Sequence, residues 1–274
     1  MRETEKRRME TNRKRWGESV GPHFRSRDYD VAGFRKGRLS VHLLEIGQMG
    51  PVRGKSLLHV QCHFGMDTLS WARLGARVTG VDYSHEAVAT ARRLAVETGL
   101  GSRAKFVESN VYDMARNLRG KFDIVYTGKG ALCWLPDLRS WGKLVSRFLK
   151  PGGRFYLLES HPFGDLYEDD LPEWRQKYAY FRERPIRDEY DESYATEGTK
   201  LRNRVSYGWL HPVSEVLGSL IDAGLEVEEI REFPFTYWKM LPKMRLGRDG
   251  WWHLPKDEGR VPLMWSVRAR KVAR

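Results

Sequence analysis

Residues 55–160 alternate between short segments with strand character and segments with helix character, joined by brief connectors. The segment at 56–61 (SLLHVQ) has the character of a buried strand, and 77–82 repeats the strand pattern after one short helical stretch. This alternation is typical of a parallel sheet that is covered by helices on both faces. We therefore expect an α/β fold built around a mostly parallel sheet.

The alternation of helix and strand segments continues past residue 210, where one amphipathic helix and two further strands follow. The expected helices lie at about 67–74, from Ser84 to Gly99, at 141–148 and from Pro212 to Gly224. Asp67 and Ser84 are residue types that cap helix N-termini, and we expect each to cap its helix. Residues 151–153 (PGG) are expected to form a turn. Seven strands are predicted, at 56–61, 77–82, 105–108, 122–126, 154–159, 225–233 and 262–271.

Two segments fall outside this alternation. Residues 1–50 are charged and helical in character, and we expect an N-terminal helical extension that acts as a lid. Residues 163–207 are too long for a plain connector and are rich in Tyr and Trp. We expect an insertion that forms a lid or binding loop within a domain spanning 51–274. A small satellite core of aromatic side chains is the alternative.

The net charge of +12 is concentrated at the two ends of the chain. Residues 1–15 hold seven Lys/Arg against three Glu, and residues 268–274 hold four Arg/Lys. The insertion is acidic, with eleven Asp/Glu against eight Lys/Arg. Charged chain ends are usually solvated tails, so a nucleic-acid partner is not expected. A basic end that touches a polyanion remains the alternative.

Hydrophobic residues make up 41% of the 274 residues, which is enough for a large core. No apolar run reaches the roughly 18 to 20 residues of a membrane-spanning helix, and residues 1–15 lack the apolar core of a signal peptide. We therefore expect a cytoplasmic protein without a membrane partner. Cys62 and Cys133 are too few for a disulfide framework or a metal site, and we expect small buried thiols and no metal.

The region most informative about function is 57–84. In an open parallel sheet, ligands bind at the carboxyl ends of the strands, beside the point where the strand order reverses. Gly65, a helix N-terminus near Asp67, and Asp82 supply a close backbone, free N–H groups and a carboxylate for ribose hydroxyls. A dinucleotide fingerprint would place three glycines here, whereas Gln61 and His63 occupy two of those positions. A nicotinamide-dependent oxidoreductase is therefore disfavoured.

At this point the sequence resembles the class I S-adenosylmethionine-dependent methyltransferases, over roughly 55–161. It is most similar to a bacterial small-molecule branch in which a Gln-Cys-His-x-Gly loop replaces the glycine-rich one, and His59 stands where the family usually has an acid. The resemblance implies a Rossmann-like sheet and S-adenosyl-L-methionine as cofactor. It rests on HVQCHFG at 59–65, Asp82, SNV at 109–111, FDIV at 122–125 and LKPGG at 149–153.

The resemblance also implies cofactor contacts at the strand ends. The loop after the first strand and the end of the fourth would hold the methionine part, the second strand the ribose, and the third the adenine. In the same branch, a segment bearing Trp16, His23 and Tyr29 would fold over the cofactor. The expected cofactor-binding residues are Tyr29, Gln61, His63, Gly65, Asp82, Tyr83, Asn110, Val111 and Thr127.

The acceptor is expected beside the fourth and fifth strands. Lys129 and Trp134 follow the fourth strand and are predicted to contact the acceptor. His161 follows the fifth strand and is predicted to act as a general base, since histidine titrates near neutral pH. His211 is a second candidate for the base and is predicted to contact the acceptor. A solvated lysine and a purely structural histidine are the alternatives.

These expectations converge on a methyltransferase that modifies an oxygen or nitrogen of a small molecule. Two alternatives remain open, namely an RNA-modifying methyltransferase and a methyltransferase-like scaffold that binds the cofactor without methyl transfer. The identity of the acceptor and the oligomeric state have no signature in the sequence.

Overall fold

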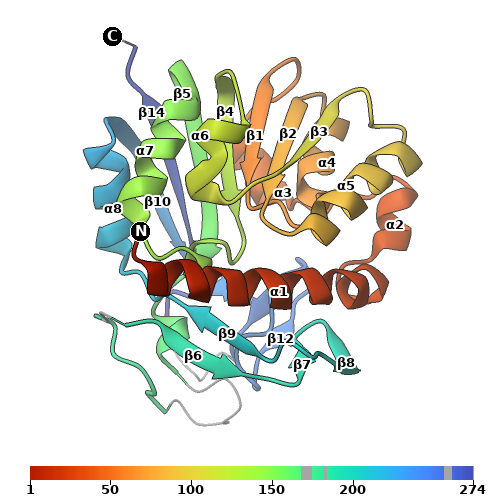
Figure 1. Ribbon diagram of the computed structural model, residues 1–274, viewed down its shortest axis with the longest axis vertical. Coiled ribbons are helices and arrows are strands. Elements are labelled where there is room, and N and C mark those ends of the chain that lie inside the picture. The colour runs from red at the N-terminus through yellow and green to blue at the C-terminus, as the bar shows by residue number, and fades with distance from the viewer. Residues whose placement is uncertain (168–174, 182–183, 256–260, 274) are drawn as a thin grey trace.

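A computed structural model describes residues 1–167, 175–181, 184–255 and 261–273. Its centre is a seven-stranded sheet of order β10-β14-β5-β4-β1-β2-β3 (Figure 1). Neighbouring strands from β5 to β3 pair in parallel, and β14 pairs antiparallel with both β5 and β10. The predicted seven-stranded, mostly parallel sheet is confirmed. Its strands are β1 (Ser56–Val60), β2 (Arg77–Asp82), β3 (Ala104–Glu108), β4 (Phe122–Gly128), β5 (Leu149–Ser160), β10 (Leu225–Phe233) and β14 (Met264–Lys271).

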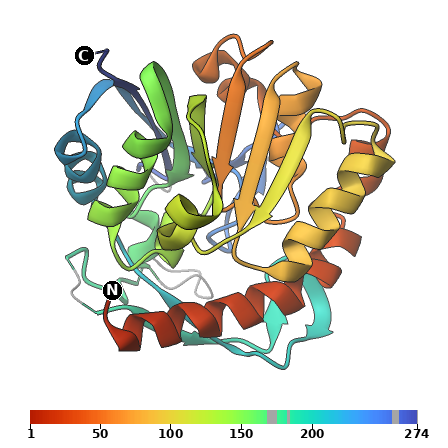
Figure 2. The ribbon, with the colours of Figure 1, turned by 45° about the horizontal axis from the view of Figure 1, so that its top comes forward.

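Helices cover both faces of the sheet, as predicted (Figure 2). Alternate residues of each strand point to opposite faces, so that Leu58 packs with Trp141 of one helical layer and Leu57 with Trp71 of the other. All four side chains are fully buried. The first layer holds α6 (Met114–Asn117), α7 (Leu138–Phe148) and α8 (Val213–Asp222), and the second holds α3 (Leu43–Met49), α4 (Met66–Arg73) and α5 (His85–Glu97).

Local signals placed some helix ends correctly and others incorrectly. Ser84 caps α5, and its hydroxyl accepts a 3.1 Å hydrogen bond from the Ala87 N–H. Asp67 does not cap α4, which was the prediction. The chain enters α4 through Gly65, whose φ of +82° makes the turn directly, and Asp67 lies in the first helical turn beside Lys129. The expected turn at 151–153 is a bulge within β5, because Phe122 pairs with Leu149 and Ile124 with Arg154.

The N-terminal segment forms α1 (Glu3–Arg25) and α2 (Val31–Arg35). In both ribbon views α1 runs across the carboxyl edge of the sheet (Figures 1 and 2). The basic residues near the N-terminus therefore belong to a helix, as the helical character of residues 1–50 predicted, and the expectation of a solvated tail was wrong. Arg15 donates hydrogen bonds of 3.0 Å to main-chain oxygens of the insertion, namely those of Tyr190, Glu192, Asn203 and Arg204.

The C-terminal charges are also structured. Arg268 and Arg270 lie on β14 and pair with Glu228 of β10, at 3.3 Å and 2.6 Å. In the described part of the chain, no helix combines the length and the apolar character that crossing a bilayer requires.

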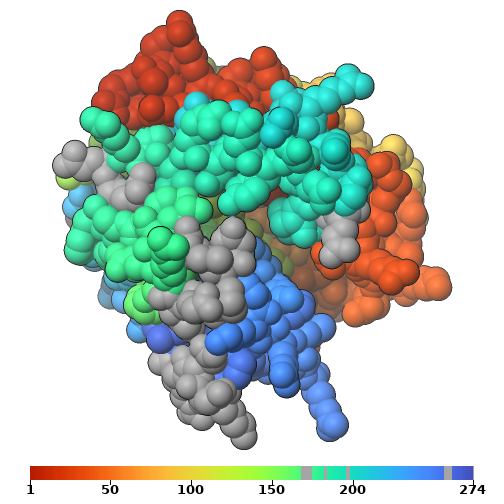
Figure 3. Space-filling view, turned by 90° about the horizontal axis from the view of Figure 1, so that it is seen from below, coloured from red at the N-terminus to blue at the C-terminus, as the bar shows by residue number. Residues whose placement is uncertain are grey.

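The insertion adds two small hairpins on the far side of α1 from the sheet (Figure 1). One pairs β6 (Ile186–Glu189) with β9 (Val205–Gly208), and the other pairs β7 (Glu192–Ser193) with β8 (Thr196–Lys200). A three-stranded sheet of β11 (Phe235–Thr236), β13 (Trp252–His253) and β12 (Arg245–Leu246) follows later in the chain. Seen from below, the insertion and the 235–254 segment border a hollow (Figure 3). Trp174, part of the expected aromatic lid, lies outside the described residues.

Candidate cofactor and acceptor site

The loop after β1 adopts the left-handed backbone conformation at every second residue. The φ angles are +62° at Gln61, +48° at His63 and +82° at Gly65. Left-handed backbone costs a non-glycine residue about 1–2 kcal/mol and is concentrated at functional sites. Two hydrogen bonds offset this cost, from Gln61 Nε2 to the Ala131 carbonyl (2.9 Å) and from the His63 N–H to Asp82 Oδ2 (2.7 Å). The backbone of the loop therefore follows a path typical of glycine-rich loops, although Gln61 and His63 carry larger side chains.

Gly65 is a glycine for a packing reason as well. A Cβ at this position would lie 2.7 Å from the Phe106 ring and 3.0 Å from the Ala91 side chain. The loop thus packs closely on β3 and α5, which holds its backbone against the sheet edge.

Asp82 ends β2 and is held by two main-chain groups. Its Oδ2 accepts from the His63 N–H, and its Oδ1 accepts from the Ser84 N–H at 2.9 Å. Burial raises the pKa of this carboxyl, and the hydrogen bonds to its oxygens act in the opposite direction. The carboxylate is therefore fixed between the β1 loop and α5, where ribose hydroxyls were predicted to bind.

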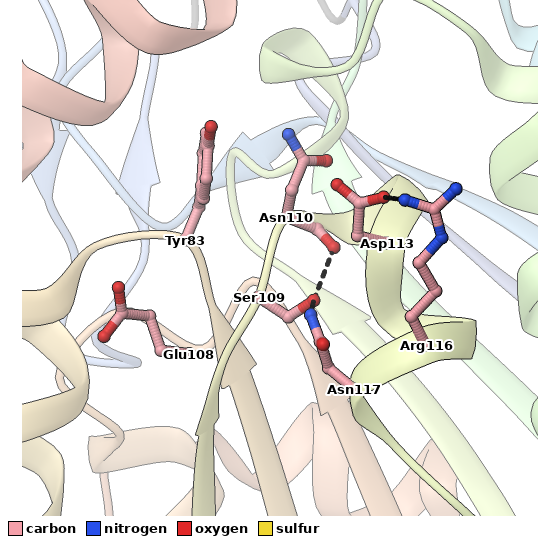
Figure 4. A pocket seen from close by; sticks show the side chains of 7 residues that line it. All are labelled: Tyr83, Glu108, Ser109, Asn110, Asp113, Arg116 and Asn117. Atoms are coloured by element: carbon pink, nitrogen blue, oxygen red, sulfur yellow. Dashed lines mark hydrogen bonds and ion pairs between the residues drawn. The ribbon is translucent and has the colours of Figure 1, made fainter.

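A cavity of about 320 Å³ opens at the carboxyl end of β3 (Figure 4). In the close view Tyr83 and Asn110 extend in the same direction from neighbouring strand ends. Asn110 Oδ1 accepts a 3.0 Å hydrogen bond from the Tyr112 N–H, at the start of a short 3-10 helix that begins at Val111. The cavity is lined by Tyr83, Glu108, Ser109, Asn110, Asp113, Arg116 and Asn117.

Two oxygens at the ends of β1 and β4 lack hydrogen-bond partners among the described residues. They are Gln61 Oε1 and Thr127 Oγ1, both buried. The strands are adjacent, with Val60 opposite Thr127. Because an unpaired buried oxygen costs about 1–3 kcal/mol, a ligand with several donors, such as an ammonium group, would be stabilised here. These residues fit the amino-acid end of the expected cofactor.

The Lys129 ammonium is already paired with protein groups. Its Nζ lies 2.9 Å from Asp67 Oδ2 and 3.4 Å from Glu45 Oε2, and it donates to the Ser40 carbonyl at 3.3 Å. Burial lowers the Lys129 pKa, but the attraction of Asp67 and Glu45 is larger, and the net pKa is raised. The acceptor contact predicted for Lys129 stays a prediction, and an acceptor would have to compete with these partners.

Both nitrogens of His161 and of His211 are also engaged. His161 Nδ1 accepts from the Phe163 N–H at 3.1 Å, and its Nε2 lies 3.0 Å from Glu232. His211 bridges Glu215 (3.0 Å) and the Leu135 carbonyl (2.8 Å). Neither ring offers a free lone pair in this geometry. The general-base role of His161 stays a prediction, and the geometry favours a positioning role.

The lid residues meet over the β1 loop. Nδ1 of His23 on α1 lies 3.1 Å from His63 Nε2, and the Tyr29 and Tyr194 hydroxyls are 2.5 Å apart. The Trp16 ring lies 5.3 Å from the His63 ring and 5.4 Å from the Trp134 ring. The structure therefore brings the predicted Tyr29, His63 and Trp134 together in one aromatic cluster, which we call the lid cluster: Trp16, His23, Tyr29, His63, Trp134 and Tyr194.

Sequence reasoning missed two residues that shape this site. Glu159 is buried, and its carboxylate accepts hydrogen bonds of 2.5–3.0 Å from the N–H groups of Gly130, Ala131, Leu132 and Ser160. A charged residue at the end of an apolar strand is a signal that could have identified it. Ser193 hydrogen-bonds His23 from the insertion, and no sequence pattern marks that contact.

The structure resembles solved methyltransferases. It superposes on an S-adenosylmethionine-dependent methyltransferase of Listeria monocytogenes described as putative (TM-score 0.61, 20% identity, covering 89% of this chain and 98% of that one). It also superposes on one from Mesorhizobium loti (TM-score 0.59, 21% identity, 86% and 100%) and on the glycopeptide N-methyltransferase MtfA (TM-score 0.55, 19% identity, 90% and 92%). These likenesses show the fold.

Sequence comparison finds similar proteins over the central part of the chain. Residues 58–157 match the family described as methyltransferase domain. A ubiquinone biosynthesis O-methyltransferase of Cronobacter sakazakii is 34% identical over 135 residues, which are 48% of this chain and 54% of that protein. The chain spans about half the length of the curated relatives it matches. The Gln-Cys-His-x-Gly branch stays a prediction. Residues 58–157 therefore match a methyltransferase domain, and the chain has the fold of solved S-adenosylmethionine-dependent methyltransferases.

Proposed function

We propose that this chain is a cytoplasmic enzyme that uses S-adenosyl-L-methionine to methylate an oxygen or nitrogen of a small molecule. One observation carries the proposal. The order β4-β1-β2-β3 places Thr127, Gln61, Asp82 and Asn110 at successive strand ends along one edge of the sheet. Unpaired oxygens, a fixed carboxylate and a cavity then follow in the order that the amino-acid, ribose and adenine parts of the cofactor require.

The relatives support a small acceptor. Their names include ubiquinone biosynthesis O-methyltransferase and glycopeptide N-methyltransferase, which methylate oxygen and nitrogen respectively. The fold alone does not determine an acceptor, so the choice between oxygen and nitrogen rests on the site.

The bound cofactor would supply a methyl group on a positively charged sulfur. The chain has three tasks, which are to align the acceptor, to exclude water and to remove a proton where the acceptor carries one. The lid cluster supports the second task, because its rings cover the β1 loop, and ring faces attract a cation. Glu159 supports the first, because it fixes the loop that carries Trp134.

Calorimetric titration with S-adenosylmethionine and S-adenosylhomocysteine tests the proposal. We expect both to bind the wild-type chain, and Asp82→Asn to weaken binding about 10- to 100-fold, because hydrogen bonds to a charged carboxylate contribute about 1.5–3 kcal/mol. Asp222→Asn, the same change at an exposed residue of α8, is the control and should bind as the wild type does. No heat with either compound, or equal affinity in Asp82→Asn, contradicts the proposal.

The two alternatives have tests of their own. A scaffold that only binds the cofactor would give no labelled product when metabolite extracts are incubated with isotopically labelled methyl donor. An RNA-modifying enzyme would bind RNA with strong salt dependence, and Arg7→Gln with Lys14→Gln would reduce that affinity, since both side chains are exposed on α1.

A further inference from the structure

Three side chains from distant parts of the sequence form one hydrogen-bonded chain beside the β1 loop. His63 Nε2 lies 3.1 Å from His23 Nδ1, and His23 Nε2 hydrogen-bonds Ser193 Oγ. His63 belongs to the β1 loop, His23 to α1 and Ser193 to β7 of the insertion. His23 and Ser193 are buried, with 1% and 8% of their surfaces exposed.

The hydrogen bonds that link His63, His23 and Ser193 allow two arrangements of their hydrogens. In one, Ser193 donates to His23, His23 donates to His63, and His63 Nδ1 carries a hydrogen. In the other, each bond is reversed and His63 Nδ1 carries a lone pair. Across the described residues, His63 Nδ1 has no hydrogen-bond partner. Its free end can therefore accept a proton when the bonds reverse.

Both rings are neutral at physiological pH. Burial lowers the pKa of His23 to about 4, with a further contribution from Arg15, and lowers that of His63 well below its usual value. The charged and titratable groups around the pair are Arg15 on α1, Asp82 on β2, and the Tyr29 and Tyr194 hydroxyls. A neutral pair would be a weak base if it kept the proton. The histidine pair can still transfer a proton, because neither ring carries a positive charge once the direction of each hydrogen bond has reversed.

The position of His63 and His23 in the candidate site distinguishes them from the other two histidines considered, His161 and His211. The main-chain N–H of His63 donates a hydrogen bond to Asp82, the residue expected to hold the ribose. The His63 ring therefore lies next to the edge of the sheet where the cofactor is expected. Trp16 contacts both His63 and Trp134, and Trp134 follows β4, where the acceptor was expected. His161 and His211 have both nitrogens engaged.

The surroundings also indicate the kind of acceptor. The rings that surround His63 and His23 are those of Trp16, Trp134, Tyr29 and Tyr194. The nearby charged side chains already have protein partners. Lys129 pairs with carboxylates, Glu159 accepts hydrogen bonds from N–H groups, and Arg15 donates hydrogen bonds to carbonyls. Flat rings without a free charge favour a neutral aromatic molecule.

We propose that His63, His23 and Ser193 form a relay that removes the proton from an aromatic hydroxyl acceptor, an inference that rests on the proposed function. As the acceptor oxygen takes the methyl group from the sulfonium, its O–H bond breaks and the proton passes to His63 Nδ1. His63 Nε2 gives its hydrogen to His23 Nδ1, and His23 Nε2 gives its hydrogen to Ser193 Oγ. Ser193 releases its own hydrogen to solvent, so one proton leaves for each methyl group transferred.

The first test needs no turnover. In the full chain labelled with ¹⁵N-histidine, nitrogen spectra recorded from pH 8 to 5.5 should show His23 and His63 remaining neutral. Ser193→Ala should change the nitrogen shifts of both rings, because the bonds are linked. Protonation of either ring near pH 6.5, or a Ser193→Ala spectrum in which His63 is unchanged, overturns the relay.

The second test measures methyl transfer to catechol, pyrogallol and, for comparison, hexylamine. We expect transfer to the two phenols, and a 10²- to 10⁴-fold lower kcat in His63→Gln, measured at saturating S-adenosyl-L-methionine. His63→Gln should regain rate as pH rises toward the acceptor pKa, whereas the wild-type rate stays flat. If His63 only holds the lid, the pH profile of His63→Gln should match that of the wild type, and this result overturns the relay.

His253→Gln is the control, since that side chain pairs with Asp249 on the separate three-stranded sheet. Methyl transfer to hexylamine alone, or no transfer to either phenol while the cofactor binds, overturns the relay. Neither result contradicts the proposed cofactor site. Loss of cofactor binding by the wild type is a different outcome, and it overturns the proposed function itself.

Discussion

Asp67 Oδ2 lies 2.9 Å from Lys129 Nζ, and this ion pair links the first turn of α4 to the end of β4. Glu45, whose side chain is fully buried, completes the network and accepts a 2.7 Å hydrogen bond from the Tyr126 hydroxyl. The pair fixes α4 against the loop that follows β4. Two carboxylates therefore depend on one ammonium for their charge balance.

Lys129→Met should destabilise the protein by about 3–5 kcal/mol, because it leaves buried carboxylates without a cation. The control is Lys150→Met, which removes the more exposed pair with Asp123 and should cost about 1 kcal/mol or less. Urea unfolding at pH 7 measures both. Equal losses in the two variants would show that the buried network does not contribute as described.

Asp123 gives a predicted dependence on pH. Burial raises its pKa, but hydrogen bonds from Ser56 and the ion pair with Lys150 outweigh burial, and the net pKa is lowered. Because the folded-state pKa lies below the unfolded value of about 4, the stability from this carboxylate is present above pH 4 and is lost as pH falls. Asp123→Asn should cost about 1–2 kcal/mol at pH 7 and less at pH 3, because at pH 3 the unfolded chain takes up a proton at Asp123 while the folded chain still keeps the carboxylate ionised. A constant difference across that range, in urea titrations, contradicts the prediction.

Asn12 holds α1 to the insertion through a reciprocal pair of hydrogen bonds. Its Nδ2 donates to the Tyr207 carbonyl at 2.7 Å, and its Oδ1 accepts from the Tyr207 N–H at 2.8 Å. Asn12→Ala should leave the partly buried Tyr207 N–H without its partner and speed hydrogen exchange of α1 and β9 by about 10-fold or more. Thr11→Ala, which removes only a hydroxyl bonded within α1, should leave β9 unchanged. Similar exchange in the two variants would contradict the role of Asn12.

Gly142 and Gly218 lie on the facing helices α7 and α8 and should respond in opposite directions. A Cβ at Gly142 would collide with the Ser219 carbonyl, whereas one at Gly218 meets nothing within 4 Å. Gly142→Ala should destabilise by about 1–3 kcal/mol, and Gly218→Ala should stabilise by about 0.5–1 kcal/mol. Thermal unfolding of the two variants measures the difference. A gain at Gly142 would mean that the helices can separate at little cost.

Much of the sheet was predictable because its signals are local. A mostly apolar segment such as 57–60, a cap such as Ser84 and a carboxylate such as Asp82 at a strand end each depend on neighbours within a few residues. Parallel pairing then brings the carboxyl ends together, so Asp82 and Asn110 could be assigned to one edge without a structure. Asp67 was placed wrongly as a cap because its partner, Lys129, is 62 residues away.

The sequence by itself determined the α/β architecture, the strand segments and the edge of the sheet that carries the candidate cofactor site, because periodicity and strand ends are short-range properties of the chain. Only the tertiary structure decided which side chains meet over that edge. His23 meets Ser193 across 170 residues, and Arg15 meets carbonyls more than 170 residues away. Such contacts depend on how α1 and the insertion pack together, and packing between distant segments leaves no periodic pattern in either one.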